Sequence, residues 1–147
     1  MVSITKNWSD DYKSFEELKN RLLFKRIVDW TADYLILDDG TKIEIGETEQ
    51  DCCASAVGEF KDVKLDAMIT DVCIEDVKNI NSYEDSYETH SECVLKIFHN
   101  QNPIALAECE ANNSNGDYYY SVVGLRIKGD YFYILGSTDD GSEVKHD

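Results

Sequence analysis

The segment from Tyr34 to Ile45 constrains the fold of this chain most strongly, because its apolar side chains alternate on both sides of a turn sequence. Two runs rich in Ile and Leu flank Asp39-Gly40, a dipeptide that favours a type I′ turn between antiparallel strands. Side chains alternate between the two faces of a strand, so each run has one face to bury. With this turn we expect Ile36 to pair with Ile43 and Tyr34 with Ile45, and we assign these four side chains to the core.

Only one segment has the spacing of a helix. Ser14 and Glu17 form a capping-box pattern, followed by apolar positions at Leu18 and Leu22. This predicts a helix over about residues 14–24 that covers one face of a sheet. Further strands are predicted at residues 67–77, 93–99, 104–110, 118–128 and 131–135, and the polar, acidic stretch 79–91 is predicted as a long loop.

These patterns predict an α+β fold for the chain. We expect one N-terminal helix packed on a mostly antiparallel sheet of six to eight strands over about residues 27–135, followed by a short acidic C-terminal tail. No internal repeat or second domain is evident, so residues 1–147 are interpreted as a single domain. That length buries enough apolar surface to fold without a metal or a disulfide.

The composition excludes several classes of protein. An apolar share of 42% with nine Tyr and five Phe excludes a fully disordered acidic chain. Five cysteines cannot all pair within one chain, and no apolar leader follows the N-terminus, so we expect a protein of the reducing cytoplasm. Apolar runs are far shorter than the roughly 20 residues that span a bilayer, and no membrane partner is predicted.

The formal net charge is −16, and it is unevenly distributed. Residues 1–30 carry six cations and five anions, residues 31–92 four and seventeen, and residues 93–147 four and eight, which gives sums of +1, −13 and −4. Such a localised field predicts a surface that occupies a basic, nucleic-acid-binding partner in place of nucleic acid, while the simpler interpretation is solubility. The residues predicted to bind this partner are Glu47, Glu49, Asp51, Glu75, Asp76, Tyr83, Glu84, Asp85, Tyr87 and Glu88.

Cysteine and histidine positions offer a weak zinc hypothesis. Cys52 and Cys53 are adjacent, and His90 and Cys93 have a spacing that allows them to complete a Cys₃His site. The alternative is that the strand cysteines are small buried apolar residues, which we favour, so no metal or other cofactor is predicted. Phosphate-binding glycine loops and nucleophile motifs are absent, and we expect a protein that is not an enzyme.

A second interpretation concerns small nucleotides. A base can stack on a tyrosine while a guanidinium holds a phosphate, and these residue types follow one another late in the chain. The simpler alternative pairs the tyrosines across strands and the arginine with carboxylates. The residues of this alternative nucleotide site are Tyr118, Tyr119, Tyr120, Arg126 and Lys128.

Five short motifs occur between about residues 22 and 128. They are Leu37-Asp-Asp-Gly40, Gln50-Asp-Cys-Cys-Ala54, Gly58-Glu-Phe-Lys-Asp62, Ile69-Thr-Asp71 and Asn115-Gly-Asp-Tyr-Tyr119. Together they resemble an uncharacterised domain family of bacteriophages and Gram-positive bacteria that is marked by twin cysteines after an acidic hairpin.

The resemblance implies a small accessory protein of phage type, acting in the host cytoplasm. We therefore expect a non-enzymatic inhibitor that binds the nucleic-acid-binding surface of a host defence protein, for example an anti-CRISPR protein, without binding nucleic acid itself. The alternatives are a sponge that sequesters a cyclic nucleotide immune signal and a structural interaction protein. A homo-oligomer is compatible with each of them.

Overall fold

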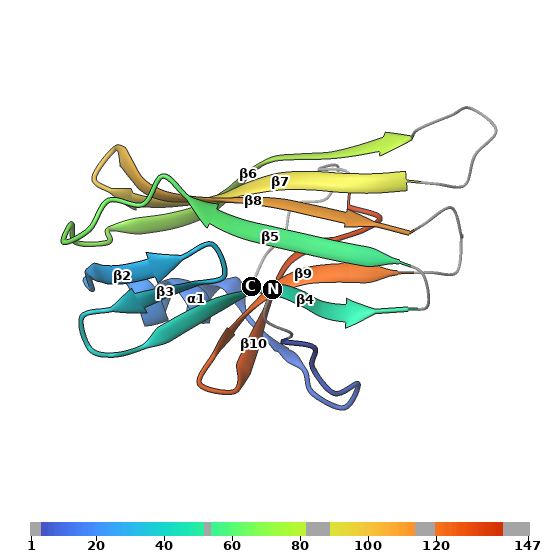
Figure 1. Cartoon of the computed structure of the whole chain (residues 1–147), viewed down its shortest axis with the longest axis horizontal. Helices are drawn as coiled ribbons and strands as arrows, with labels where there is room; N and C mark the ends of the chain where they lie inside the picture. Colours follow the sequence, from blue (N-terminus) through green and yellow to red (C-terminus); the bar gives the residue numbers. More distant parts are fainter. Residues whose placement is uncertain (1–3, 52–53, 82–88, 114–119, 140–147) are drawn as a thin grey trace.

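Two β-sheets lie face to face in the computed structural model of the protein, which describes residues 4–51, 54–81, 89–113 and 120–139 (Figure 1). The larger sheet has six strands and the smaller has four. In order across the larger sheet, the strands are β1 (Tyr12–Lys13), β10 (Asp130–Gly136), β9 (Ser121–Ile127), β4 (Lys42–Gln50), β3 (Tyr34–Leu37) and β2 (Ile27–Thr31). Within it, the β1 and β10 pair is parallel and the other pairs are antiparallel.

The smaller sheet is antiparallel throughout and contains the longest strands. Its order is β5 (Ser55–Lys61), β8 (Asn102–Asn112), β7 (Thr89–His99) and β6 (Asp71–Asn81). Small and apolar residues alternate with polar ones along β8, so the inner face of that strand is formed by Ala105, Ala107, Cys109 and Ala111, all buried. The other face of this sheet is turned away from the larger sheet.

The core lies between the two sheets. Leu95 and Ile97 of β7 are buried in one cluster with Ile43, Ile45 and Leu125 of the larger sheet. Gly58 of β5 faces the larger sheet so closely that a Cβ atom there would lie 2.8 Å from Ile45 Cδ1. Each sheet therefore buries its apolar face against the other, as in a β-sandwich.

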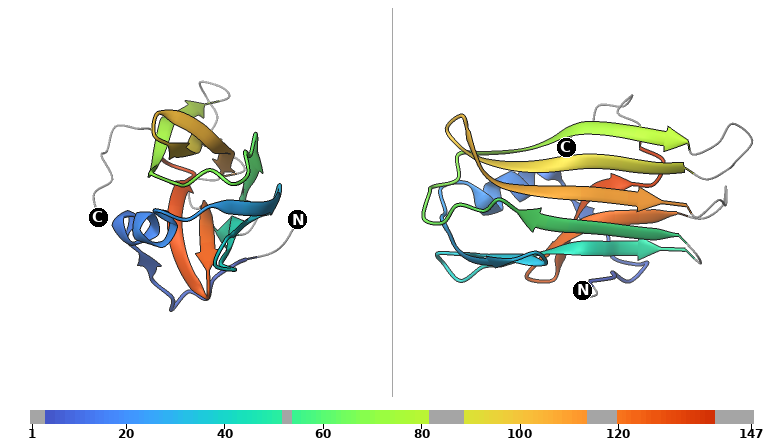
Figure 2. Two further views of the ribbon diagram at one scale, coloured as in Figure 1. Left: turned by 90° about the vertical axis from the view of Figure 1, so that its left-hand side faces the viewer. Right: turned by 45° about the horizontal axis from the view of Figure 1, so that its top comes forward.

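The predicted α+β class is wrong, because the fold is mostly β. The described residues contain one helix, α1 (Phe15–Leu22), of eight residues. At a rise of about 1.5 Å per residue this helix is too short to cover a sheet. It lies instead at the side of the two sheets (Figure 2) and contacts β6 of one and β10 of the other. The predicted N-cap is confirmed, since Ser14 Oγ accepts a hydrogen bond from Glu17 N at 3.1 Å.

The predicted register of the β3–β4 hairpin is also wrong. Leu35 pairs with Ile43, and Tyr34 pairs with Glu44. The loop has three residues rather than two: Leu37 N donates to Thr41 O, and Gly40 has φ +86°. A three-residue loop ending in a left-handed glycine shifts the register by one position, which exchanges the faces of the first strand. Leu35 and Leu37 are therefore buried, and Tyr34 and Ile36 are only half-buried.

The predicted loop at residues 79–91 is too long. β6 extends to Asn81 and β7 begins at Thr89, with Asn79 paired to Ser91 in the ladder. Asn79 Nδ2 donates to Ser91 Oγ at 3.0 Å, so polar side chains on the inner side of these strands satisfy one another. The polar residues that led to the loop prediction therefore belong in part to the ends of β6 and β7.

Candidate functional site

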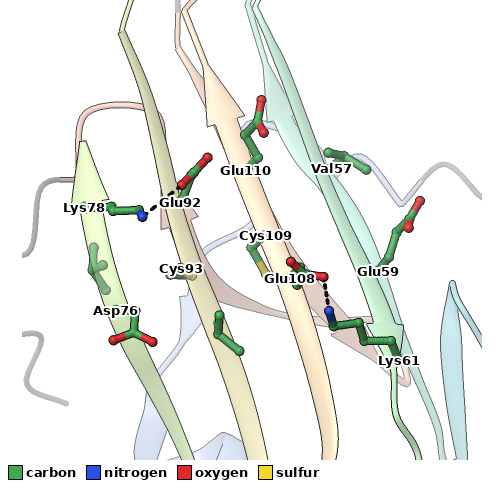
Figure 3. Close-up of a pocket in the computed structure, with 12 residues that line it drawn as sticks. Val57, Glu59, Lys61, Asp76, Lys78, Glu92, Cys93, Glu108, Cys109 and Glu110 are labelled. Carbon is green, nitrogen blue, oxygen red and sulfur yellow. Dashed lines mark ion pairs between the residues drawn. The ribbon is translucent and has the colours of Figure 1, made fainter. Parts of the chain in front are cut away.

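The outer face of the four-stranded sheet carries a broad hollow of about 810 Å³ (Figure 3). All four strands contribute to it, because residues that alternate with the buried positions of β5 to β8 point outward. We name this surface the acidic sheet face and define it by its six carboxylates. They are Glu59, Glu75, Asp76, Glu92, Glu108 and Glu110.

Like charges lie directly opposite one another on this face. Glu92 of β7 pairs with Glu110 of β8 in the ladder, and Glu108 of β8 pairs with Glu59 of β5. Directly opposed residues of an antiparallel pair have Cβ atoms about 5 Å apart, where like charges destabilise the sheet. The fold therefore holds these carboxylates together at a cost to its stability.

Lysines compensate for part of this charge. Lys61 pairs with Glu108, Lys78 Nζ lies 3.5 Å from Glu92 Oε1, and Lys96 Nζ lies 2.7 Å from Glu75 Oε1. Lys61 and Lys78 come from β5 and β6, the two edge strands of the sheet. Six carboxylates against these three lysines leave a formal charge of −3 on the face.

Three carboxylates of the face have no such compensation: Glu59, Asp76 and Glu110. Their side chains form no ion pair or hydrogen bond within the part of the chain that the structure describes, and all three are exposed. Figure 3 shows Glu59 and Glu110 on either side of Glu108. These three groups are the ones most available to a cation from outside.

Short contacts link the protonation states of Cys73, Glu75 and Lys96 at one corner of the face. The hydrogen bond from Lys96, together with one from Cys73, lowers the pKa of Glu75. Cys73 Sγ donates to Glu75 Oε2 at 3.3 Å, and burial together with this carboxylate raises the pKa of the Cys73 thiol to about 11. Glu75 is therefore ionised and Cys73 is a neutral thiol at neutral pH.

The structure separates the carboxylates that were predicted to act together. Glu75 and Asp76 belong to the acidic sheet face, whereas Glu47 and Glu49 lie on β4 in the other sheet and Asp51 follows that strand. Glu47 Oε2 accepts a hydrogen bond from Ala56 N at 2.8 Å, and Glu49 forms an ion pair with the buried Lys6 at 2.9 Å. The predicted residues Tyr83, Glu84, Asp85, Tyr87 and Glu88 lie outside the described residues.

The sequence prediction did not include four members of the face. Glu108 and Glu110 alternate with Ala107, Cys109 and Ala111, a period-two pattern that places both carboxylates on one outward face. That signal was present in the sequence. Glu59 and Glu92 have no comparable signal, because their proximity to β8 depends on strand pairing over long sequence separations.

The two candidate zinc ligands on β7 point to opposite faces of the sheet, so they do not share a site. His90 points outward, with Nε2 3.3 Å from Glu92 Oε2, whereas Cys93 is buried and paired with Cys109 on the inner face. Cys52 and Cys53 lie outside the described residues. Among the residues that are described, no group of three His, Cys, Asp or Glu side chains is arranged to hold a metal.

The residues of the alternative nucleotide site lie at opposite ends of β9. Tyr120 precedes this strand, and its hydroxyl lies 3.2 Å from that of Tyr133, whereas Lys128 follows the strand. Arg126 forms a two-point pair with Glu44, with both N–O distances at 2.9 Å. Tyr118 and Tyr119 lie outside the described residues.

Comparisons with known proteins give a family but no activity. The model of a family described as a domain of unknown function, DUF7448, matches residues 20–125. No curated protein matches the chain, and no solved structure does. Within the described residues, α1 is far too short to cross a membrane, and no other helix is present. The match spans most of the chain and nearly the stretch that the sequence motifs indicated, so the chain belongs to the DUF7448 family.

Proposed function

We propose that this protein is a non-enzymatic binding protein whose acidic sheet face covers the nucleic-acid-binding surface of another protein. The observation that carries the proposal is the pair of like-charge rungs, Glu92 with Glu110 and Glu59 with Glu108. Selection for stability alone disfavours such rungs. A partner that brings cations to this face removes the repulsion, and the gain appears as binding free energy.

The chemistry of the face defines the partner. Its hollow of about 810 Å³ is broad and open, and carboxylates come from all four strands. Arginine recognises carboxylates with a planar, two-point fork, and nucleic-acid-binding proteins use arginine widely to contact phosphates. A basic groove shaped for a nucleic acid therefore has donors that fit Glu59 and Glu110.

The biological setting of the proposal comes from the sequence. The resemblance to a domain family of bacteriophages and Gram-positive bacteria supports a host defence protein as the partner, for example a CRISPR effector, in the cytoplasm of the host. The finding that the chain belongs to a family without assigned function is compatible with this setting and with others. The proposal for the acidic sheet face itself depends on the charge arrangement and holds for any basic nucleic-acid-binding partner.

Affinity capture with competition by DNA tests the proposal. The full-length protein is immobilised and exposed to host lysate at low salt, and the bound proteins are eluted with duplex DNA. We expect DNA to release a nucleic-acid-binding protein, because both ligands use the same cations. Bound proteins that duplex DNA does not displace would overturn the proposal.

A variant with two neutralised carboxylates tests whether the acidic sheet face is the surface that captures the partner. In Glu59→Gln/Glu110→Gln, both substituted side chains are exposed and have no partner in the described structure, so the fold should not suffer. The matched control is Glu16→Gln/Asp38→Asn, which removes the same charge from exposed positions on α1 and in the β3–β4 loop. We expect the face variant to capture less partner and the control to match the unaltered protein.

A further inference from the structure

A second hollow, of about 480 Å³, lies on the larger sheet between two hairpin tips and has the opposite charge. It is formed where the β3–β4 hairpin and the β9–β10 hairpin lie next to each other, because β4 pairs with β9 up to the rung Ile43–Ile127. Lys42, just before Ile43, and Lys128, just after Ile127, lie beyond this rung, one on each hairpin. With Arg126, they bring three cations to a hollow whose only acidic side chain, among the described lining residues, is Glu44.

The cations of this hollow differ in how they are held. Arg126 is fixed, because Glu44 lies directly opposite it in the ladder and accepts hydrogen bonds from Nε and Nη2 at 2.9 Å. Tyr131 of β10 lies opposite Arg126 on its other side. The guanidinium is therefore held in one orientation by its neighbours on both strands.

Lys42 and Lys128 are exposed and have no carboxylate partner in the described part of the chain. Eight of the thirteen described lysines and arginines form an ion pair, and Lys42 and Lys128 are among the five that do not. Lys42 Nζ instead lies 4.5 Å from the centre of the Tyr34 ring. An aromatic face holds the ammonium group without neutralising its charge.

The turn that carries Lys128 is specified by backbone conformation. Lys128 and Gly129 have φ values of +51° and +85°, the combination of a two-residue type I′ turn. Asn, Asp and Gly adopt such a conformation more readily than a residue with a long side chain. A lysine at this position accepts a conformational cost while adding a cation to the rim of the hollow.

From this geometry we infer that the hollow binds a small ligand bearing two or more phosphate groups. Its volume lies within the range of small-molecule sites, about 300–1,000 Å³. Two ammonium groups at the rim suit the oxygen atoms of successive phosphates, which bind lysine as a point charge. The formal charge of +2, from three cations and Glu44, attracts such an anion locally. Of the carboxylates next to the lining residues in the chain, Asp39 and Asp130 form ion pairs with Lys25 and Arg21, and Asp38 has no ion pair in the described structure. Carboxylates more than about 10 Å away are largely screened at 0.1 M salt.

Calorimetry with two probes tests the inference on the full-length protein. Tripolyphosphate and ATP are titrated at about 0.1 M salt without divalent metal. If only tripolyphosphate binds, or if both probes bind with equal affinity, the phosphate groups are sufficient for binding. If ATP binds more tightly, the hollow also accommodates a nucleoside. Each of these results supports the site. Absence of binding with both probes overturns it.

Substitutions locate the binding and separate it from the net charge. Lys42→Gln/Lys128→Asn should weaken binding about tenfold or more, because both rim contacts are lost, and Asn tolerates positive φ. The control, Lys13→Gln/Lys64→Gln, removes two exposed lysines that have no ion pair in the described structure and that do not line the hollow. Equal losses in the two variants overturn the site. Lys42→Arg should retain binding, and its failure to do so in a folded protein counts against the site as well.

Discussion

At the scale of single residues, Cys73 connects the electrostatics of the acidic sheet face to a measurable reaction. Its thiol donates to Glu75, and burial together with that carboxylate raises the pKa of Cys73 to about 11. Lys96 holds Glu75 in its ionised form from the other side. The reactivity of Cys73 therefore reports whether the corner of the face is assembled as described.

Alkylation of Cys73 should follow this raised pKa. Only the thiolate reacts, so the rate in the folded protein should rise about tenfold per pH unit from pH 8 to pH 10 without levelling. In the urea-unfolded protein the rate should level above about pH 9, near the ordinary thiol pKa. Mass spectrometry assigns the modified cysteine at each pH. A folded-state profile that levels near pH 9 would contradict the described contacts, and Glu75→Gln should raise the rate at pH 8.

At the scale of elements, α1 joins the two sheets at their side. Leu18 and Leu22 are fully buried in the common core. Next to these leucines, the half-buried Lys19 and Arg21 reach the two sheets: Lys19 Nζ lies 3.2 Å from Asp71 of β6, and Arg21 Nη2 lies 2.6 Å from Asp130 of β10. Ion pairs that remain accessible to solvent contribute little to stability, so we expect the helix to be held mainly by its leucines.

Substitution of Leu18 should therefore be costly. Leu18→Ala removes a fully buried side chain and leaves a cavity in the core beneath the helix, which should lower the free energy of unfolding by about 2–5 kcal/mol. Asn20→Ala, at an exposed position of the same helix, is the control and should change it by less than about 0.5 kcal/mol. Urea denaturation measures both variants. Equal stabilities would show that the helix does not seal the core.

At the scale of the whole molecule, the sequence predicted most strands but not what covers them. Alternation along β8 shows that one face of the strand is buried, yet it is the same whether a helix or a second sheet lies against that face. The register of the β3–β4 hairpin depends on whether its loop has two or three residues. Both kinds of loop can place a glycine at positive φ, so Asp39-Gly40 does not by itself distinguish between them.

The candidate site, too, could be predicted from the sequence only in part. The excess of acidic residues in the middle of the chain was visible by counting, and Glu108 with Glu110 could be assigned to one face by their spacing. The opposition of Glu92 to Glu110 could not be predicted, because it depends on which strands become neighbours and in which register. A local pattern predicts the face of a residue, and only the tertiary fold determines its neighbours.

The central claim is that the acidic sheet face binds a basic surface through Glu59 and Glu110. Its most direct test is the affinity of a partner released by DNA for the unaltered protein, for Glu59→Gln/Glu110→Gln and for the control Glu16→Gln/Asp38→Asn, each titrated between about 0.05 and 0.5 M salt. We predict that affinity falls steeply with salt, that the face variant binds about tenfold or more weakly at low salt, and that the control is unchanged. Equal affinities of the two variants, or an affinity independent of salt, would contradict the claim.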